Sequence, residues 1–306
     1  MNNSAVDNTE NVSLIRLLEV LWKDKLIILV TSLCAALIAI YVSIFILPEK
    51  YKSQVLMMPA DMSSMNTTSS SIGGLASLAG VSLAEETTEA SVALEVIKSR
   101  LFTKEFIKKR EILVPLIAAK GWDKSSNKLI IDNDLYDESS EKWVRNVSFP
   151  KKTIPNDQEA FKYWKDEVFS ISQDRKTGYI SMSIEFFSPH ISKDWATWIV
   201  EDINNTMRDQ AVKEAQLSIE YLNNELNSTT SEELKSLFYL IIKDNTEKIM
   251  LAYSRPEYVF KVIDPPIAPY LKSYPQRLII VISSTIIGFF IGIFISLIRN
   301  FLRNRT

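Results

Sequence analysis

Cysteine, histidine and glycine are scarce in this chain, and each shortage excludes a class of chemistry. The 306 residues include one cysteine, Cys34, one histidine, His190, and seven glycines. A single cysteine cannot form an intrachain disulfide, and these two residues cannot supply the ligands of a zinc centre. The glycines form neither GxxxxGK[ST] nor GxGxxG, so no nucleotide-phosphate loop is predicted. We therefore predict no metal and no cofactor.

Catalytic side chains are equally hard to find. Paired carboxylates of the kind that glycosidases use occur as Glu85-Glu86 and Glu232-Glu233. The first pair lies in a predicted loop, and the second lies at a predicted helix start, where acidic residues favour the helix dipole. His190 falls between a predicted strand and a predicted helix, which favours a structural role over that of a general base. The sequence predicts no catalytic residue and a protein that is not an enzyme.

Two long runs without a charged residue are the strongest feature that is present. The first is Leu26–Leu47, with 22 residues, and the second is Leu278–Ile298, with 21. A helix of 21 residues spans about 31 Å, enough to cross a hydrocarbon core. The first run is too long for the apolar part of a signal peptide and is not followed by a small-residue cleavage site. We predict two transmembrane helices, 26–47 and 278–298.

Charge beside these runs predicts how the chain is oriented. The tails 1–25 and 299–306 each carry three basic residues, so both termini are predicted to be cytoplasmic. The tail 1–25 is also predicted to contain an interfacial helix. The region 48–277 holds 29 of the 35 basic and 33 of the 37 acidic residues, a net charge of −4. A balance of this sign argues against nucleic acid as a partner. We predict a large outer domain between two spans.

The outer domain begins with a mixture of strand and helix patterns. Residues 51–58 alternate as a strand, 90–110 carry a helical apolar stripe, and 120–160 are polar and irregular. Within 168–186, the runs VFSIS and YISMSIEF flank a turn with Gly178, as in a β-hairpin. Residues 61–90 are rich in serine, threonine and small residues. They fit a surface loop or an apolar segment that packs on a neighbouring subunit or the membrane.

A long helical hairpin is predicted over about 190–255, a stretch with few helix breakers. Apolar residues recur every four positions, so the first helix is expected from Ser192 to Leu226, and a Thr230–Glu233 capping box starts the second. A spacing of four drifts from 3.6 and makes the apolar stripe wind around the helix. We expect a neighbouring subunit to cover part of this stripe, which consists of Ile199, Ile203, Met207, Ile219, Leu222 and Leu226.

The approach to the second span is rich in proline. A strand is expected at 258–263, followed by a stiff extended connector over 264–277, because proline fixes φ and lacks an amide donor. The prolines of this connector are Pro265, Pro266, Pro269 and Pro275. In the second span Gly288 and Gly292 form a GxxxG motif, which lets helix backbones approach closely. These two glycines are the candidate membrane-helix interface.

Taken in order, these stretches resemble one family, the Wzz-type polysaccharide co-polymerases, or O-antigen chain-length determinants. The resemblance rests on NVSLIRLLEVLWKDKLIILV, EKYKSQVLM, GGLASLAG, TGYISMSIEFFSPHISKDWATWIVEDIN and LKSLFYLIIKDNTEKIMLAYSRPEYVFKVIDPPIAPYLKSYPQR. It implies an α+β fold: a periplasmic α/β base domain, a long projecting helical hairpin, and two flanking transmembrane helices in the inner membrane of a Gram-negative cell. It also implies a ring of identical subunits.

The implied function is to set the chain length of lipopolysaccharide O-antigen, together with the O-antigen polymerase. Lipid-linked polysaccharide and membrane lipid are the further partners expected. Relatives that serve capsule, enterobacterial common antigen or exopolysaccharide synthesis are the alternative, and some of these carry a tyrosine kinase, for which eight residues after Ile298 leave no room. Two remote alternatives are a membrane sensor and a membrane-bound polysaccharide hydrolase. The sensor would need a cytoplasmic output module, and the hydrolase would need a carboxylate pair about 5–10 Å apart in a cleft.

Overall fold

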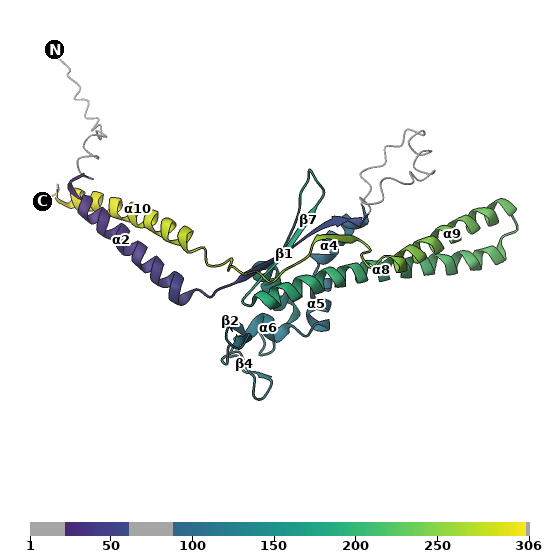
Figure 1. Ribbon diagram of the computed structural model, residues 1–306, viewed down its shortest axis with the longest axis horizontal. Coiled ribbons are helices and arrows are strands. Elements are labelled where there is room, and N and C mark those ends of the chain that lie inside the picture. Colours follow the sequence, from purple (N-terminus) through teal and green to yellow (C-terminus); the bar gives the residue numbers. More distant parts are fainter. Residues whose placement is uncertain (1–21, 61–87, 304–306) are drawn as a thin grey trace, which may run out of the picture. The chain divides into compact units, whose positions relative to one another are not determined.

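The computed structural model describes residues 22–60 and 88–303, which belong to two compact units (Figure 1). One unit contains the residues up to Glu49 and those from Ser273 onward, and the other contains Lys50–Lys272. Most of the predicted interfacial helix, the pair Glu85-Glu86, the GGLASLAG segment and the last three residues of the carboxyl-terminal tail lie outside the described residues.

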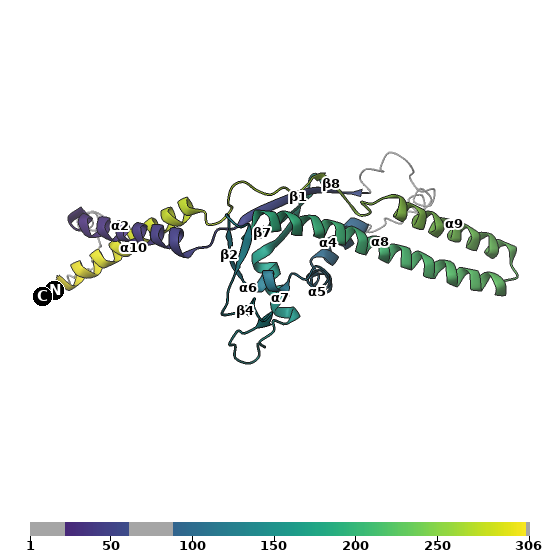
Figure 2. The same cartoon turned by 60° about the horizontal axis from the view of Figure 1, so that its bottom comes forward.

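The first unit consists of two apolar helices that run side by side (Figure 2). Helix α2 (Lys25–Tyr41) continues into a π-helix, η1 (Val42–Ile46), and helix α10 covers Arg277–Arg303. Both are long and apolar enough to cross a membrane. Helix α10 begins one residue before the predicted span and ends five residues after it, because the helix continues past the apolar run.

A four-stranded antiparallel sheet forms the centre of the second unit. Its strand order is β6-β7-β1-β8, with β1 at Tyr51–Pro59, β6 at Phe169–Gln173, β7 at Ile180–Phe186 and β8 at Phe260–Asp264. The predicted hairpin is therefore β6-β7, with Gly178 at a φ of 72° in its turn. Strand β8 starts two residues later than the sequence predicts.

One face of this sheet lines the hydrophobic core of the unit. Side chains of β1 and β7 that point to this face are fully buried, as the alternation of the two strands requires. They are Val55, Met57, Ile180, Met182, Ile184 and Phe186. Helix α8 (Pro189–Ser228) packs against both strands and adds Trp195, Ile199 and Ile203, each exposed by 2% or less. The start of the long helix is thus part of the domain core, which confirms the predicted α+β fold.

Two sequence predictions for the region between β1 and β6 are wrong. The helix expected over 90–110 is two helices, α4 (Glu89–Ile97) and α5 (Arg100–Lys109), because the side chain of Ser99 accepts a hydrogen bond from the amide of Phe102 and starts a new helix. Helix α6 (Leu113–Ala118) follows.

The second correction concerns 120–160, which the sequence assigns to irregular structure. Two small hairpins form there, β2-β3 (Ala119–Asp123 with Lys128–Ile131) and β4-β5 (Tyr136–Asp137 with Lys142–Trp143), before α7 (Asp157–Tyr163) and the π-helix η3 (Trp164–Val168). Each turn is built on an aspartate that accepts hydrogen bonds from two serines, which lowers the pKa of Asp123 and of Asp137 to about 2.

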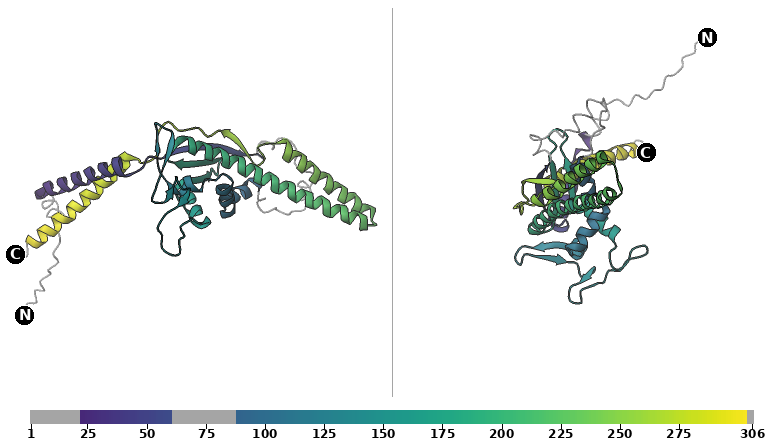
Figure 3. Two further views of the ribbon diagram at one scale, coloured as in Figure 1. Left: turned by 90° about the horizontal axis from the view of Figure 1, so that it is seen from below. Right: turned by 90° about the vertical axis from the view of Figure 1, so that its right-hand side faces the viewer.

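The predicted helical hairpin is present (Figure 3). Helix α8 has 40 residues, about 60 Å, and begins before Ser192 because Pro189 suits the first turn of a helix. Helix α9 (Glu232–Ser254) has 23 residues. Its cap is Ser231 and not Thr230: the hydroxyl of Ser231 accepts from the amide of Leu234 and donates to Glu233.

Candidate functional site

The glycines of the GxxxG motif lie against the other membrane helix of the same chain. A Cβ atom at Gly288 would stand 2.6 Å from the Cβ of Ala35 and 3.0 Å from the Cα of Ser32. At Gly292 it would meet the side chain of Thr31 and the backbone of Ile28. Only glycine therefore allows α10 and α2 to approach this closely. The structure gives these glycines an intrachain partner, and a contact with another protein stays a prediction.

Polar side chains tie the same two helices together at two further points. The hydroxyl of Ser284 donates to the carbonyl of Ala35 at 3.0 Å. Near the chain termini, the hydroxyl of Ser296 donates to Asp24 at 3.0 Å, and Arg299 lies 3.9 Å from the same carboxylate. Hydrogen bonds between apolar helices fix their mutual rotation. The membrane unit is therefore a defined helix pair.

A buried amide, Asn204, holds the root of the hairpin to the edge of the sheet. Its Oδ1 accepts hydrogen bonds from the amides of Val259 and Phe260 at 2.9 and 3.0 Å. Its Nδ2 donates to the carbonyls of Val200 and Phe260 at 3.0 and 3.1 Å. Asn204 is 3% exposed, and all four positions of its amide are used. One side chain thus links α8 to β8.

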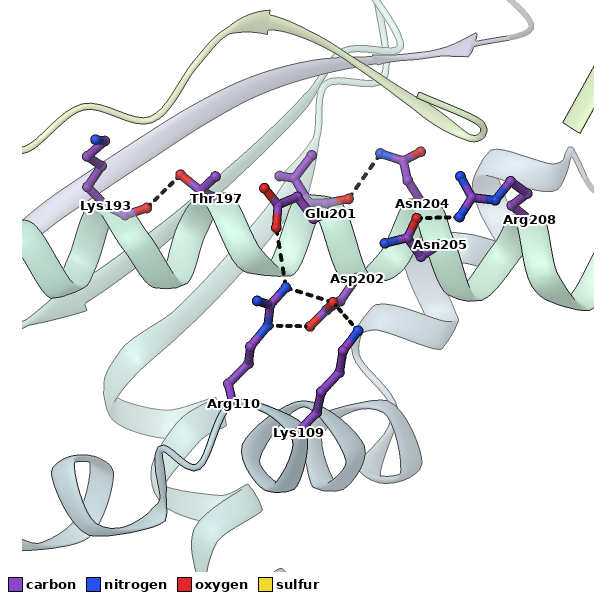
Figure 4. A network of polar contacts seen from close by, with 10 residues as sticks. Lys109, Arg110, Lys193, Thr197, Glu201, Asp202, Asn204, Asn205 and Arg208 are labelled. Carbon is purple, nitrogen blue, oxygen red and sulfur yellow. Dashed lines mark hydrogen bonds and ion pairs between the residues drawn. The ribbon is translucent and has the colours of Figure 1, made fainter. Parts of the chain in front are cut away.

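The neighbouring aspartate, Asp202, links α8 to the end of α5 (Figure 4). Its buried carboxylate receives the Nζ of Lys109 at 2.7 Å and two nitrogens of Arg110, at 2.9 and 3.1 Å. The guanidinium of Arg110 also lies over the ring of Trp198, 5.1 Å from its centroid. The hydrogen bond with Asp202 raises the pKa of Arg110 above its ordinary value. Two cations therefore neutralise one buried charge.

The predicted subunit-packing stripe requires a correction. Ile199, Ile203, Met207 and Leu222 are exposed by 7% or less within the chain itself, and Ile219 and Leu226 are half-buried. The first three belong to the core on the sheet, and the later part of α8 packs against α9. The winding stripe meets two intrachain partners in succession, the sheet and then α9. The four buried residues are therefore not a contact for a neighbouring subunit.

The proline-rich connector faces the polar side of α8. Pro265 and Pro266 line a groove of about 580 Å³ together with Lys193, Thr197 and Arg208 of the helix. Pro266 and Pro275 are buried, Pro269 is half-buried and Pro265 is exposed. Between these prolines, the carbonyl of Ile267 accepts a hydrogen bond from Ser53 of β1 at 2.8 Å. The first part of the connector is thereby fixed to the sheet.

The remaining candidates for chemistry are His190, Cys34 and the pair Glu232-Glu233. His190 is exposed, with its ring 6.3 Å from that of Trp122, and Cys34 is exposed on α2. Glu232 pairs with Lys235, and the hydrogen bond from Ser231 lowers the pKa of Glu233. Among residues 22–60 and 88–303 no group of three or more histidine, cysteine, aspartate or glutamate side chains is placed to hold a metal ion.

The comparison with known families agrees with the resemblance in the sequence. Residues 10–110, about one third of the chain, match the family model Wzz, described as chain length determinant protein. The Wzz resemblance is confirmed. Wzz proteins determine chain length, and the two candidate spans of this Wzz-like chain fit a two-pass inner-membrane protein.

Two solved structures are similar to this Wzz-like chain at low identity. A full-length bacterial polysaccharide co-polymerase aligns with a TM-score of 0.37 and 16% identity, over 95% of this chain and 98% of that one. A fragment of WzzB, a polysaccharide co-polymerase from Salmonella Typhimurium, aligns with a TM-score of 0.29 and 14% identity, over 74% of this chain and 100% of the fragment. None of the curated proteins matches the chain in sequence.

Sequence reasoning missed Asp202, Asn204 and their partners. A usable signal is present, because both residues are short, polar and directly beside the apolar position Ile203 of the same helix. A polar side chain beside a buried helical stripe needs hydrogen-bond partners from another element. The sequence does not say which element supplies them.

Proposed function

We propose that this protein regulates the chain length of lipopolysaccharide O-antigen as an oligomeric scaffold in the inner membrane. It acts with the O-antigen polymerase and does not itself catalyse a reaction. Both termini lie in the cytoplasm, the domain 48–277 lies in the periplasm, and identical subunits associate side by side. The family match and the two candidate spans support this proposal.

Helix α9 carries the argument for a scaffold. It has 23 residues, yet Ala252 is its one buried residue. Large apolar side chains on α9 are between 42% and 68% exposed, namely Leu234, Leu237, Tyr239, Leu240, Met250, Leu251 and Tyr253. Helices in proteins owe most of their stability to packing of an apolar face, so a helix that leaves this many large apolar side chains exposed is a candidate for packing against a partner. A second copy of the hairpin offers the matching surface.

Deletion of the gene tests the function directly. We expect gel electrophoresis of lipopolysaccharide to show that the preferred O-antigen length is lost in the deletion strain and restored by the intact gene. An unchanged distribution of lengths would overturn the proposed function. The same gels on capsule and exopolysaccharide fractions separate the O-antigen role from the other polymers.

The scaffold itself is tested on the full-length protein in lipid nanodiscs. Leu237→Asp with Leu240→Asp places two charges on the exposed face of α9, and we expect a shift from oligomer to monomer by mass photometry. The matched control is Ser236→Asp, an exposed position on the same helix that carries no apolar side chain. A wild-type protein that is a stable monomer would contradict the scaffold.

A further inference from the structure

Two neighbouring large side chains of the proline-rich connector are exposed to solvent. Tyr270 is 96% exposed and Leu271 is 75% exposed, and the backbone bends at both residues. They stand between Pro269 and Pro275 in the sequence, and proline stiffens the chain on either side of them. The bend therefore presents an aromatic ring and an aliphatic side chain together, with little cover from the described residues.

This bend follows a point of the connector that is fixed at the start of the sheet. The carbonyl of Ile267 accepts a hydrogen bond at 2.8 Å from the hydroxyl of Ser53, the third residue of β1. The side chain of Ile267 is itself 68% exposed, whereas Tyr51, the first residue of β1, is buried. The start of the sheet thus covers one aromatic side chain and leaves the apolar side chains of the connector uncovered.

Chain length keeps both of these segments close to the candidate spans. Leu271 precedes Arg277, the first residue of α10, by six residues, and six residues reach at most about 22 Å when fully extended. The true reach is shorter, because the amide of Arg277 donates to the carbonyl of Pro275 at 2.9 Å and turns the chain. Ser53 likewise follows Leu47, the end of the first apolar run, by six residues.

The chemistry of the exposed pair suits the boundary between lipid and water. Tyrosine is enriched at this boundary, because its ring is apolar while its hydroxyl stays in contact with water. Leu271 adds a purely aliphatic side chain that gains by leaving water. A protein partner would also cover the pair, but the membrane is the one apolar surface that the short link to α10 already places nearby.

We propose that Tyr270 and Leu271 insert into the periplasmic interface of the bilayer and anchor the connector to lipid. The proposal rests on the membrane placement of α10 in the proposed function, and it is independent of the polymer whose length is regulated. Because the carbonyl of Ile267 is bonded to Ser53, this anchor also holds the start of β1 beside the membrane.

Fluorescence quenching of the full-length protein in phosphatidylcholine vesicles tests the anchor. In a Cys34→Ala background, a single cysteine replaces Tyr270 or Leu271 and carries the environment-sensitive dye NBD. We expect quenching by phosphatidylcholine that bears a nitroxide near its headgroup, and little quenching by aqueous iodide. The matched control is Tyr221→Cys, at a position 63% exposed and about 44 Å along α8 from Ser192, which bonds to the carbonyl of Tyr51. It should be quenched by iodide only.

A charge beside the dye provides a second measurement. Leu271→Asp in the Tyr270→Cys protein should restore iodide quenching, because a carboxylate is unfavourable on the apolar side of the interface. The same charge at an exposed position of α8, Leu217→Asp, should leave the lipid quenching unchanged. Both side chains are exposed, so the fold is retained in either variant.

A cysteine at Ile282 of α10, which is 50% exposed, separates failure of the anchor from failure of the proposed function. Lipid quenching at 282 together with iodide quenching at 270 and 271 would overturn the anchor and leave the membrane placement of α10 intact. A dye at 270 and 271 that neither quencher reaches is covered by protein, which also overturns the anchor. If 282 itself escapes lipid quenching, the membrane placement in the proposed function is wrong.

Discussion

Replacing Asn204 with alanine should loosen the root of the hairpin more than any surface change nearby. The substitution leaves the amides of Val259 and Phe260 without an acceptor, and these residues are 3% and 0% exposed. Each buried amide that loses its partner costs about 1–3 kcal/mol. We therefore expect Asn204→Ala to lower the free energy of unfolding by about 2–6 kcal/mol, a large share of the ~5–15 kcal/mol that a domain possesses.

Thermal unfolding of the full-length protein in lipid nanodiscs measures this loss. For a unit of this size, 1 kcal/mol corresponds to roughly 2–4 °C in Tm, so the midpoint should fall by about 5–20 °C. Tryptophan fluorescence reports on the core, because Trp164 and Trp195 are both buried there. Hydrogen exchange at Val259 and Phe260 should accelerate in the same variant, which locates the effect at β8.

Asn205→Ala is the matched control for this experiment. Asn205 is half-buried, and its amide oxygen accepts one hydrogen bond, from Arg208 at 2.6 Å. Its removal should cost no more than about 1 kcal/mol. If the two alanine variants unfold at the same temperature, or if Asn204→Ala matches the wild type, the amide of Asn204 does not hold the root of the hairpin to β8.

Two more predictions concern an ion pair and the helix pair. The hydrogen bond from Arg145 to Glu159, 2.8 Å between Nη2 and Oε2, lowers the pKa of Glu159. The stability that this ion pair adds to the fold is therefore complete above the ordinary glutamate pKa of about 4.3, and it is lost as the pH falls through the lowered pKa. In urea titrations, the difference in unfolding free energy between wild type and Glu159→Gln should therefore shrink from pH 6 to pH 3. A difference that stays constant would show that the Arg145–Glu159 ion pair does not stabilise the fold. For the helix pair, cysteines placed at Ala35 and Ser284 in a Cys34→Ala background should form a disulfide between α2 and α10. Gly288→Leu should separate the two helices and abolish this disulfide. The control Ile287→Leu, on an exposed face of α10, should preserve it.

Elements with a strong local period could be predicted from the sequence. The strands β6 and β7 follow an alternation of two within one short stretch, and α8 follows a recurrence of four over more than 30 residues. The small hairpins at Asp123 and Asp137 were not predicted, because their polar sequences have no alternation of apolar and polar residues. Their signal is local nonetheless, since an aspartate followed two and three residues later by serine favours a tight turn.

Contacts between distant positions could not be predicted in the same way. The partners of Asp202 stand 92 and 93 residues earlier in the chain, and those of Asn204 stand 55 and 56 residues later. The stripe on α8 shows the same limit. Its winding is visible in the sequence, but only the structure shows that the sheet covers its beginning and α9 covers its later part.

Helix α8 therefore has one end that its own chain fixes and one that it does not. At the fixed end, Ser192 bonds to β1, Asp202 to α5 and Asn204 to β8. The later part of α8 packs against α9, and of the side chains of α9 itself only Ala252 is buried. Because an exposed apolar surface gains most from association, substitutions in α9 should change the assembly while the base remains folded. Substitutions at the root should instead unfold the base, so the two classes of variant separate stability from assembly.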